Sequence, residues 1–313
     1  HTGNGILQAR QTAVVLHVLL VVIPEALQPL HHQTGGVTAV LLPGVPHECR
    51  HLAEHELLPW LRAKSDETIV SHDLHVFGLT EPQVQEKLAD LMDNAVNPSL
   101  APYAKTGEVM LRLTAKGESE ADCEERMAPL FWDVRARLGD WLYAVDTPGL
   151  EGRVLQLLKE RGLTFSAAES CTGGLIAKRI TDLSGASAVF RGGVVSYTNA
   201  VKAGVLGVPE ELLAQYTAVS GPVARAMAEG VRALTGSDLA VSVTGVAGPG
   251  PDDDGHPEGL VYAALTDGEH TWVRRLELGT GRGRIRVMAA HHAFDLLRRY
   301  LTQLPITEET EGE

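Results

Sequence analysis

The chain has 313 residues, enough for two or three domains, and 44% of them are hydrophobic, so it can bury proper cores. Its formal net charge of −13 makes the molecule as a whole repel nucleic acid and acidic membrane surfaces, so a bound phosphate must meet a local basic or backbone site. The three cysteines, Cys49, Cys123 and Cys171, are scattered and odd in number, which argues against a disulfide framework and for a reducing cytoplasm.

The first part of the chain gives few clear patterns. Residues 1–36 have no clean period, but the apolar run 12–23 is shorter than the about 20 residues of a membrane-spanning helix and lacks signal-peptide flanks. We expect a buried strand or a core helix there. Residues 36–42 predict a buried strand that ends at the prolines and glycine of residues 43–46. A helix is expected over residues 47–62.

That helix opens with His47-Glu-Cys-Arg-His51, which matches the H-E-x-x-H pattern of zinc proteases. The pattern places two imidazoles and a carboxylate on one helical face, and His55 extends the same face. A metalloprotease helix normally lies within a domain core, whereas this one begins directly after Pro46, and such short matches are common by chance. We therefore favour a solvated histidine face over a zinc site.

In residues 67–146 the hydrophobic residues recur at more regular intervals. Amphipathic helices are expected over 80–94 and 119–138. Strands are expected over 67–77, 100–104, 108–114 and 141–145. The order β-α-β-β-α-β is typical of a ferredoxin-like domain. Nothing in it looks catalytic, so we interpret it as a spacer or assembly domain.

After a linker at 146–149, a helix over 150–161 leads into a strand that ends at Ala168. A helix over 175–183 follows, and the turn between them carries Ser170, Cys171, Thr172 and two glycines. Such a turn aims backbone N–H groups and the positive end of a helix at one point, which suits a phosphate or an oxyanion. The alternative is that the hydroxyls only cap the helix and the glycines only permit the turn.

Two more residues of interest lie where the strand over 189–197 meets the next helix, which starts near Ala200. Tyr197 ends the strand and Lys202 lies in the first turn of that helix. Ligands bind at this edge of open α/β sheets, and a helix N-terminus disfavours a lysine charge, which suits Lys202 to act as a base. The alternative is an ordinary solvated lysine.

The remaining chain predicts a helix over 223–234 and a buried strand over 239–244 that runs into Gly245 and further glycines and prolines, exposing backbone N–H groups. The acidic loop 252–258 could hold a metal, but such a run is usually solvated. Two more strands are expected over 259–266 and 271–278. A last helix opens near Arg282 and Arg286, which share a face and form the best candidate for an anion clamp.

Taken together, four segments resemble the C-terminal domain of the CinA family, whose stand-alone relatives are nicotinamide mononucleotide deamidases. They are Ala168-Glu-Ser-Cys-Thr-Gly-Gly174, Gly193-Val-Val-Ser-Tyr-Thr-Asn199 with Lys202, Ser242-Val-Thr-Gly-Val-Ala-Gly-Pro249 and the arginines after Gly281. The resemblance covers about residues 150–301. Leu41-Leu-Pro-Gly-Val-Pro46 with Glu48 resembles the end of the family's molybdopterin-binding-like domain, and the unit before the linker resembles its middle domain.

The resemblance implies an α/β protein with three parts. We expect a truncated remnant of the molybdopterin-binding-like α/β domain at 1–66, a ferredoxin-like domain at 67–146 and a three-layer α/β domain with a mixed sheet at 150–303. Residues 1–36 do not match the front of the first family domain, so we expect no ADP-ribose pyrophosphatase activity. The family's Gly-Asp-Arg before the last helix is Gly281-Arg282 here, without the aspartate.

The resemblance also implies hydrolysis of nicotinamide mononucleotide to the acid and ammonia. In this hypothesis Ser170 attacks, neutral Lys202 takes its proton and Tyr197 relays or orients. The substrate-binding residues would be Thr172, Gly173, Gly174, Thr244, Gly245, Arg282 and Arg286. Alternatively, Ser170 and Thr172 bind phosphate and water attacks directly. The Cys171 side chain should point toward the core.

We expect the enzyme to be a cytoplasmic homodimer that needs no cofactor or metal and contacts neither nucleic acid nor membrane directly. The competing hypothesis is a non-catalytic CinA-type protein that recruits partners in competence or DNA-damage responses.

Overall fold

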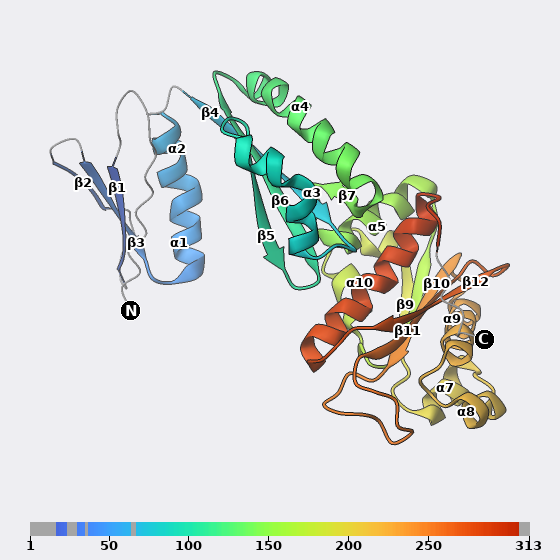
Figure 1. Cartoon of the computed structure of the whole chain (residues 1–313). Coiled ribbons are helices and arrows are strands. Elements are labelled where there is room, and N and C mark those ends of the chain that lie inside the picture. The colour runs from blue at the N-terminus through green and yellow to red at the C-terminus, as the bar shows by residue number, and fades with distance from the viewer. Residues whose placement is uncertain (1–16, 24–29, 35–36, 64–66, 307–313) are drawn as a thin grey trace. The chain divides into compact units, whose positions relative to one another are not determined.

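The computed structural model describes residues 17–23, 30–34, 37–63 and 67–306 (Figure 1). They form two compact units: residues up to 69 together with 116–123, and the rest from 70 onward. Within the described residues, no helix is both long and apolar enough to cross a bilayer. The predicted domain bounds stay a prediction.

The first unit contains a three-stranded sheet in the order β1-β3-β2, with helical segments after it. Strands β1 (His17–Ile23) and β3 (Val37–Pro43) are parallel, and β2 (Leu30–Thr34) is antiparallel to β3. The strand expected over 36–42 is confirmed, and the part of the apolar run that the structure describes is a strand. Residues 1–16, 24–29 and 35–36, on which the other predictions for this region fall, lie outside the described residues.

The helix expected over 47–62 is interrupted. It consists of α1 (Pro46–Leu52), a π-helical turn η1 (Ala53–Leu57) and α2 (Leu58–Arg62). Pro59 has no backbone N–H, so the regular i to i−4 ladder cannot continue through it. The buried side chains of Val40, Leu42 and Leu57 form the small core between this segment and the sheet.

The middle of the chain has the predicted order β-α-β-β-α-β. The four strands form one sheet in the order β5-β6-β4-β7, and both β4–β7 and β5–β6 pair antiparallel. Its elements are β4 (Thr68–Val76), α3 (Glu81–Asn94), β5 (Ser99–Lys105), β6 (Glu108–Gly117), α4 (Glu120–Leu138), the 3-10 turn η2 (Gly139–Trp141) and β7 (Leu142–Val145).

The last part of the chain is built around a five-stranded mixed sheet in the order β12-β11-β10-β8-β9. Strands β8, β9 and β10 are parallel, whereas β11 and β12 are antiparallel. The strands are β8 (Phe165–Glu169), β9 (Phe190–Val195), β10 (Leu239–Gly245), β11 (Leu260–Thr266) and β12 (Thr271–Glu277).

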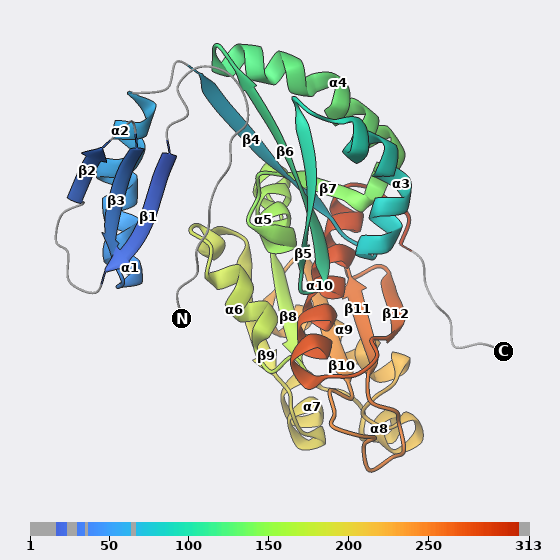
Figure 2. The ribbon, with the colours of Figure 1, turned by 60° about the vertical axis from the view of Figure 1, so that its left-hand side comes forward.

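Helices cover both faces of this sheet, so the predicted three-layer α/β fold is confirmed. The helical segments are α5 (Gly149–Arg161), α6 (Leu175–Thr181), η3 (Ala186–Ala188), α7 (Asn199–Leu206), α8 (Glu210–Tyr216), α9 (Gly221–Thr235) and α10 (Arg282–Leu301). Helices α5 and α10 lie side by side (Figures 1 and 2). The short α8 was not expected from the sequence, and it buries none of its residues.

Alternation along β10 explains the layers, because successive side chains of a strand point to opposite faces. Val241 and Val243 join the core formed with α5, α6 and α10, whereas Ala240 joins the core formed with α9. Since β8, β9 and β10 are parallel, their carboxyl ends meet at one edge of the sheet, where a ligand can bind between the loops.

Candidate active site

A pocket of about 320 Å³ opens at the carboxyl ends of the parallel strands. Its walls come from the turn after β8, the segment from the end of β9 into α7, the residues just before α9, the end of β10 with the loop that follows, and the start of α10. The lining residues are Ser170, Cys171, Tyr197, Asn199, Lys202, Ala218, Val219, Thr244, Gly245, Val246, Ala247, Gly248, Pro249, Gly250, Pro251, Asp252 and Arg282. Five segments of the chain thus meet at one cavity.

Ser170 and Lys202 lie together in this pocket. Lys202 Nζ is 3.1 Å from Ser170 Oγ and 2.9 Å from the carbonyl oxygen of Ser196. Ser170 follows β8 directly, and its backbone N–H donates to the Val243 carbonyl of the neighbouring strand at 2.9 Å. The serine is therefore held by the sheet, and Lys202 Nζ donates to both the Ser170 hydroxyl and the Ser196 carbonyl.

The Lys202 side chain is buried, with 1% of the residue exposed. Among the described residues no carboxylate forms an ion pair with it. Burial without a counter-ion disfavours the charged ammonium, so desolvation lowers the pKa of Lys202 below its ordinary value of 10.5. The lowered pKa agrees with the sequence-based expectation, but its cause is desolvation rather than the helix dipole.

Glu169 is the last residue of β8, and its side-chain carboxylate lies at the N-terminus of α6. Its carboxylate accepts hydrogen bonds from the backbone N–H groups of Ile176 and Ala177, at 3.0 and 2.9 Å. The positive end of α6 is therefore neutralised by a buried side chain of the protein itself. These two N–H groups are therefore not free for a phosphate, whereas the expectation that the turn before them suits a phosphate or an oxyanion stays a prediction.

Cys171 lies beside Ser170 but belongs to the hydrophobic core, and 6% of the residue is exposed. Burial raises the pKa of its thiol to about 12. A thiol becomes a strong nucleophile only as the thiolate, so Cys171 stays protonated and unreactive at neutral pH. This confirms the expected burial of its side chain.

Arg282 and Tyr197 form the outer rim of the pocket. Arg282 Nη2 donates to the Tyr197 hydroxyl at 3.2 Å, and Arg282 Nη1 donates to the Gly248 carbonyl at 2.8 Å. Both side chains are exposed, so the guanidinium is available to an anion that enters from solvent. The Tyr197 hydroxyl contacts Arg282 in this structure rather than the Ser170–Lys202 pair.

Glu258, which sequence analysis missed, ties together the two loops that hold Arg282. Its carboxylate accepts from the backbone N–H groups of Gly250 and Gly281, each at 2.9 Å. These two hydrogen bonds lower the pKa of Glu258. No local pattern marks this residue, since it ends the acidic run 252–258 and its partners are 8 and 23 residues away.

Some of the remaining candidate residues line the pocket and others do not. Thr244 and Gly245 line the pocket, and the Thr244 hydroxyl donates to the Ala218 carbonyl at 2.6 Å. The four other candidates, Thr172, Gly173, Gly174 and Arg286, do not line it. Arg286 instead donates to the Thr172 carbonyl at 2.6 Å and so stabilises the turn after β8. Of the two arginines expected to form an anion clamp, only Arg282 lines the pocket.

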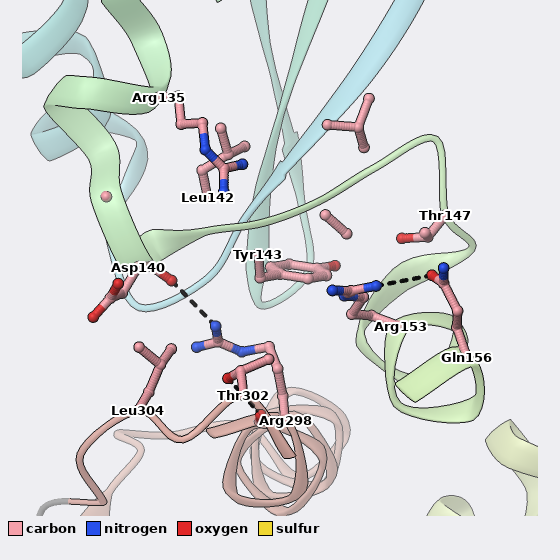
Figure 3. A pocket seen from close by; sticks show the side chains of 13 residues that line it. Arg135, Asp140, Leu142, Tyr143, Thr147, Arg153, Gln156, Arg298, Thr302 and Leu304 are labelled. Carbon is pink, nitrogen blue, oxygen red and sulfur yellow. Dashed lines mark hydrogen bonds between the residues drawn. The ribbon is translucent and has the colours of Figure 1, made fainter. Parts of the chain in front are cut away.

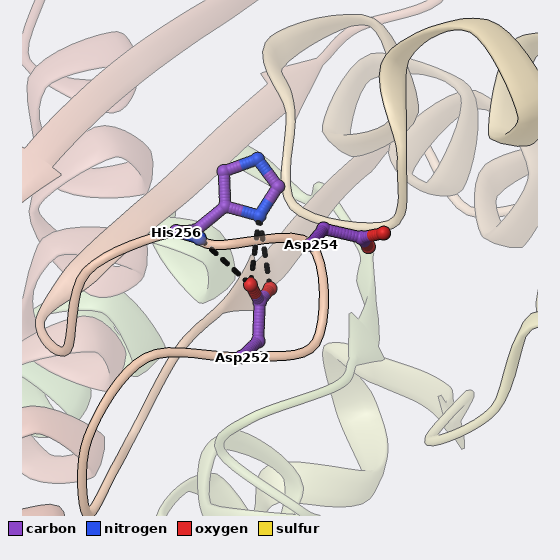
Figure 4. Close-up of side chains that lie close together, drawn as sticks. All are labelled: Asp252, Asp254 and His256. Atoms are coloured by element: carbon purple, nitrogen blue, oxygen red, sulfur yellow. Dashed lines mark hydrogen bonds and ion pairs between the residues drawn. The ribbon is translucent and has the colours of Figure 1, made fainter.

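The acidic loop beside the pocket contains the one group of potential metal ligands found within the described residues, Asp252, Asp254 and His256 (Figure 4). Asp252 accepts hydrogen bonds from both the backbone N–H and Nδ1 of His256, at 2.8 and 2.9 Å. These internal contacts suffice to shape the loop. His47 and His51 of the H-E-x-x-H pattern do not belong to such a group.

The fold and this pocket define an α/β protein with a buried serine–lysine pair beneath an arginine rim. The chain belongs to the CinA family: residues 148–301 match the CinA C-terminal domain, and residues 71–144 match the KH domain of damage-inducible protein CinA. The family model calls this second segment a KH domain, and it lies within the unit that we predicted to be ferredoxin-like.

Two relatives illustrate the match. A putative competence-damage inducible protein of Caldanaerobacter subterraneus is 45% identical over 266 residues, which are 85% of this chain and 64% of that protein. A CinA-like protein of Desulfovibrio desulfuricans is 44% identical over 274 residues, or 87% of this chain and 64% of that protein. The chain therefore spans slightly less than two thirds of the length of these relatives.

Solved structures also match the chain over about half its length. A competence/damage inducible protein from Agrobacterium tumefaciens is 39% identical, covers 50% of this chain and 98% of its own, and has a TM-score of 0.48. A CinA superfamily protein from Klebsiella pneumoniae is 32% identical, covers 49% of this chain and 96% of its own, and has the same TM-score, 0.48.

Proposed function

We propose that the pocket hydrolyses the carboxamide of nicotinamide mononucleotide to the carboxylic acid and ammonia. The observation that carries the proposal is the buried Lys202 amine, which has a lowered pKa and lies 3.1 Å from Ser170 Oγ. A neutral amine at this distance can take the proton of a hydroxyl nucleophile. The resemblance of the surrounding segments to the nicotinamide mononucleotide deamidases supplies the substrate.

The first half of the reaction forms an ester. Ser170 Oγ attacks the amide carbon while its proton passes to Lys202 Nζ, which gives a tetrahedral intermediate with a negative oxygen. The intermediate collapses as the C–N bond breaks, and the leaving nitrogen takes the proton from Lys202 to depart as ammonia. Lys202 is again neutral.

The second half removes the ester. A water molecule enters where ammonia left, and Lys202 takes one of its protons as the oxygen attacks the ester carbon. Lys202 then returns a proton to Ser170 Oγ when the C–O bond breaks, so the serine is restored and the acid is released. One base thus serves both steps.

The negative oxygen needs hydrogen-bond donors. Within the described residues, the backbone N–H groups of Cys171 and Thr172 have no acceptor, and the amide that follows the nucleophile is a common oxyanion donor. We assign this role to the Cys171 N–H, since Cys171 lines the pocket. Arg282 at the rim would bind the phosphate of the mononucleotide.

The proposal is tested by the ammonia that the purified chain releases from nicotinamide mononucleotide. We expect Ser170→Ala and Lys202→Ala each to lower kcat by about 10³-fold or more, because each removes a member of one catalytic unit. Cys171→Ala should retain most of the activity. Lys178→Ala is the matched control, since Lys178 is an exposed lysine in the neighbouring helix α6.

Two results would count against the assignment. Full activity in Ser170→Ala together with loss of activity in Cys171→Ala would make the cysteine the nucleophile. Full activity in both Ser170→Ala and Cys171→Ala would favour direct attack by water. No ammonia from the intact chain would favour the non-catalytic recruiting protein of competence or DNA-damage responses.

We further infer that the chain does not bind nucleic acid directly. Nucleic-acid-binding KH domains clamp the backbone with a G-x-x-G loop. The matched segment 71–144 has glycines only at 78, 107, 117 and 139, so no such loop is present in its sequence. The homodimer and the cytoplasmic location stay predictions.

A further inference from the structure

A second cavity, of about 430 Å³, lies between the end of the middle segment and the helices α5 and α10 (Figure 3). We call it the arginine cavity. Its lining residues are Arg135, Gly139, Asp140, Leu142, Tyr143, Ala144, Val145, Thr147, Arg153, Gln156, Arg298, Thr302 and Leu304. Its volume is within the about 300–1,000 Å³ of small-molecule sites.

Three arginines from three different helices reach this cavity. Arg135 comes from α4, Arg153 from α5 and Arg298 from α10, and in Figure 3 their guanidinium groups surround the Tyr143 side chain. Arg153 Nη1 donates to the Gln156 side chain at 3.0 Å. Neither Arg135 nor Arg153 forms an ion pair with a carboxylate among the described residues, so two positive charges stand uncompensated at the cavity wall.

The third arginine is only partly neutralised. Arg298 is buried and pairs with Asp295, with 2.6 Å between Nη2 and Oδ1. The same carboxylate also pairs with Arg274 and Arg299, at 3.1 and 3.3 Å. One negative charge thus serves three guanidinium groups.

Asp140 is the one acidic residue in the lining, and it does not offset this excess through an ion pair. Its backbone carbonyl, rather than its carboxylate, accepts from Arg298 Nη1 at 3.3 Å. The three lining arginines therefore outnumber the lining carboxylates by two. The whole chain has a net charge of −13, so a cluster of three arginines around one cavity points to a local role for positive charge there.

Thr147 adds a polar group without a partner. Its Oγ1 atom is buried and has no hydrogen-bond partner among the described residues. Thr147 lines the cavity two residues before α5 begins at Gly149, so the positive end of that helix lies at the same wall. A buried hydroxyl normally finds a partner, and an anion in the cavity would supply one.

The arginine cavity is separate from the active-site pocket. Arg282 begins α10 at the pocket, and Arg298 lies sixteen residues further along the same helix. At 1.5 Å per residue, about 24 Å of helix separates the two sites. A ligand in one therefore does not touch the other.

We propose that the arginine cavity binds a phosphate-bearing small molecule of about mononucleotide size. Arginine suits this role because its planar guanidinium offers paired donors to phosphate oxygens. Arg135, Arg153 and Arg298 hold the anion, and the Thr147 hydroxyl donates to it. The inference stands independently of the chemistry proposed for Ser170.

The test is isothermal titration calorimetry of the full chain with pyrophosphate, in an Arg282→Gln background that removes the rim arginine of the active site. We expect saturable binding at one site. Adding Arg135→Gln and Arg153→Gln should weaken it about tenfold or more, because charge-assisted hydrogen bonds to phosphate are lost. Arg161→Gln is the matched control, an exposed arginine in the last turn of α5 outside the cavity lining.

A second variant guards against a folding defect. Thr147→Val keeps the shape of the side chain and should weaken binding several-fold, while a urea unfolding curve reports whether each variant is folded. Three results would overturn the proposal: no saturable binding to the intact chain, equal binding by the folded Arg135→Gln/Arg153→Gln variant, or loss of binding through Arg282→Gln alone, which would place the ion at the active site.

Discussion

At the scale of single residues, burial distinguishes Lys202 from an ordinary lysine. Lys178 in α6 is exposed and pairs with Asp182, whereas Lys202 is 1% exposed and, among the described residues, its amine is hydrogen-bonded to neutral oxygens alone. Desolvation therefore lowers the pKa of Lys202, and its neutral form gains population toward neutral pH. A base of this kind must lose its proton before it can act.

This requirement predicts a pH dependence. Below the lowered pKa of Lys202 the amine is charged and inactive, so kcat/KM for ammonia release should rise with pH and level off once the amine is neutral, below the ordinary lysine pKa of 10.5. Lys202→Arg should abolish the activity at every pH, because a guanidinium stays protonated. The pH–rate profiles of both proteins measure this. An active Lys202→Arg variant would remove lysine from the mechanism.

At the scale of elements, the candidate active site depends on loops that Glu258 joins. The loop after β10 contributes Gly250, the loop before α10 contributes Gly281, and the Glu258 carboxylate accepts from both. Arg282 follows Gly281 and in turn donates to the Gly248 carbonyl. One side chain therefore sets the position of the rim arginine relative to the pocket.

Replacing Glu258 by glutamine should disturb this arrangement. A neutral amide has only one acceptor oxygen and turns its NH₂ group toward the second backbone N–H, so one hydrogen bond is lost. We expect about a tenfold loss of kcat/KM for nicotinamide mononucleotide, mainly through a higher KM, since the role proposed for Arg282 is to bind substrate rather than to react. Steady-state kinetics give both constants.

The matched control is Glu269→Gln, at an exposed glutamate in the turn between β11 and β12. If Glu258→Gln lowers kcat alone and leaves KM unchanged, Glu258 does not act by positioning the rim arginine.

At the scale of the whole molecule, two histidines of α10 lie against the residue that follows β4, and one of them also lies against the β5–β6 turn. The rings of His291 and His292 contact Phe77 at centroid distances of 5.8 and 5.2 Å. Gly107 in the β5–β6 turn comes so close to His291 that an added Cβ would lie 2.5 Å from its Nδ1. Burial lowers the pKa of His291 to about 3 and that of His292 to about 4.

These values predict that stability falls with acid. Between the ordinary pKa of 6.5 and the lowered values, the unfolded chain binds protons that the folded chain does not. The free energy of unfolding should therefore decrease by up to about 1.4 kcal/mol per pH unit for each histidine as the pH drops below 6.5. Urea unfolding at pH 7, 6 and 5 measures the slope.

The slope should become shallower in the His291→Gln/His292→Gln variant, because glutamine does not titrate. His270→Gln is the control, since His270 is exposed in the β11–β12 turn. The same slope in the double variant and in the original chain would show that other groups dominate the pH dependence.

Local patterns predicted much of this architecture because each element carries its own period. The strands of small and β-branched residues, such as 239–244, and the stripes of helix 150–161 need no distant information. Ser170 and Lys202 were predicted as a pair from strand-end positions and from the family resemblance. Glu169 and Glu258 could not be predicted, because their partners are backbone amides that only folding brings near.

The sequence by itself determined the order of the elements, the edge of the sheet where the candidate pocket opens and the residue types available there, since these follow from periodicity and chain connectivity. Tertiary structure decided which of those residues share a cavity. It placed Arg282 at the pocket and Arg286 against the Thr172 carbonyl outside the pocket lining, although the two are four residues apart on one helix. It also gathered the three arginines of the second cavity, because packing, rather than local sequence, brings α4, α5 and α10 together.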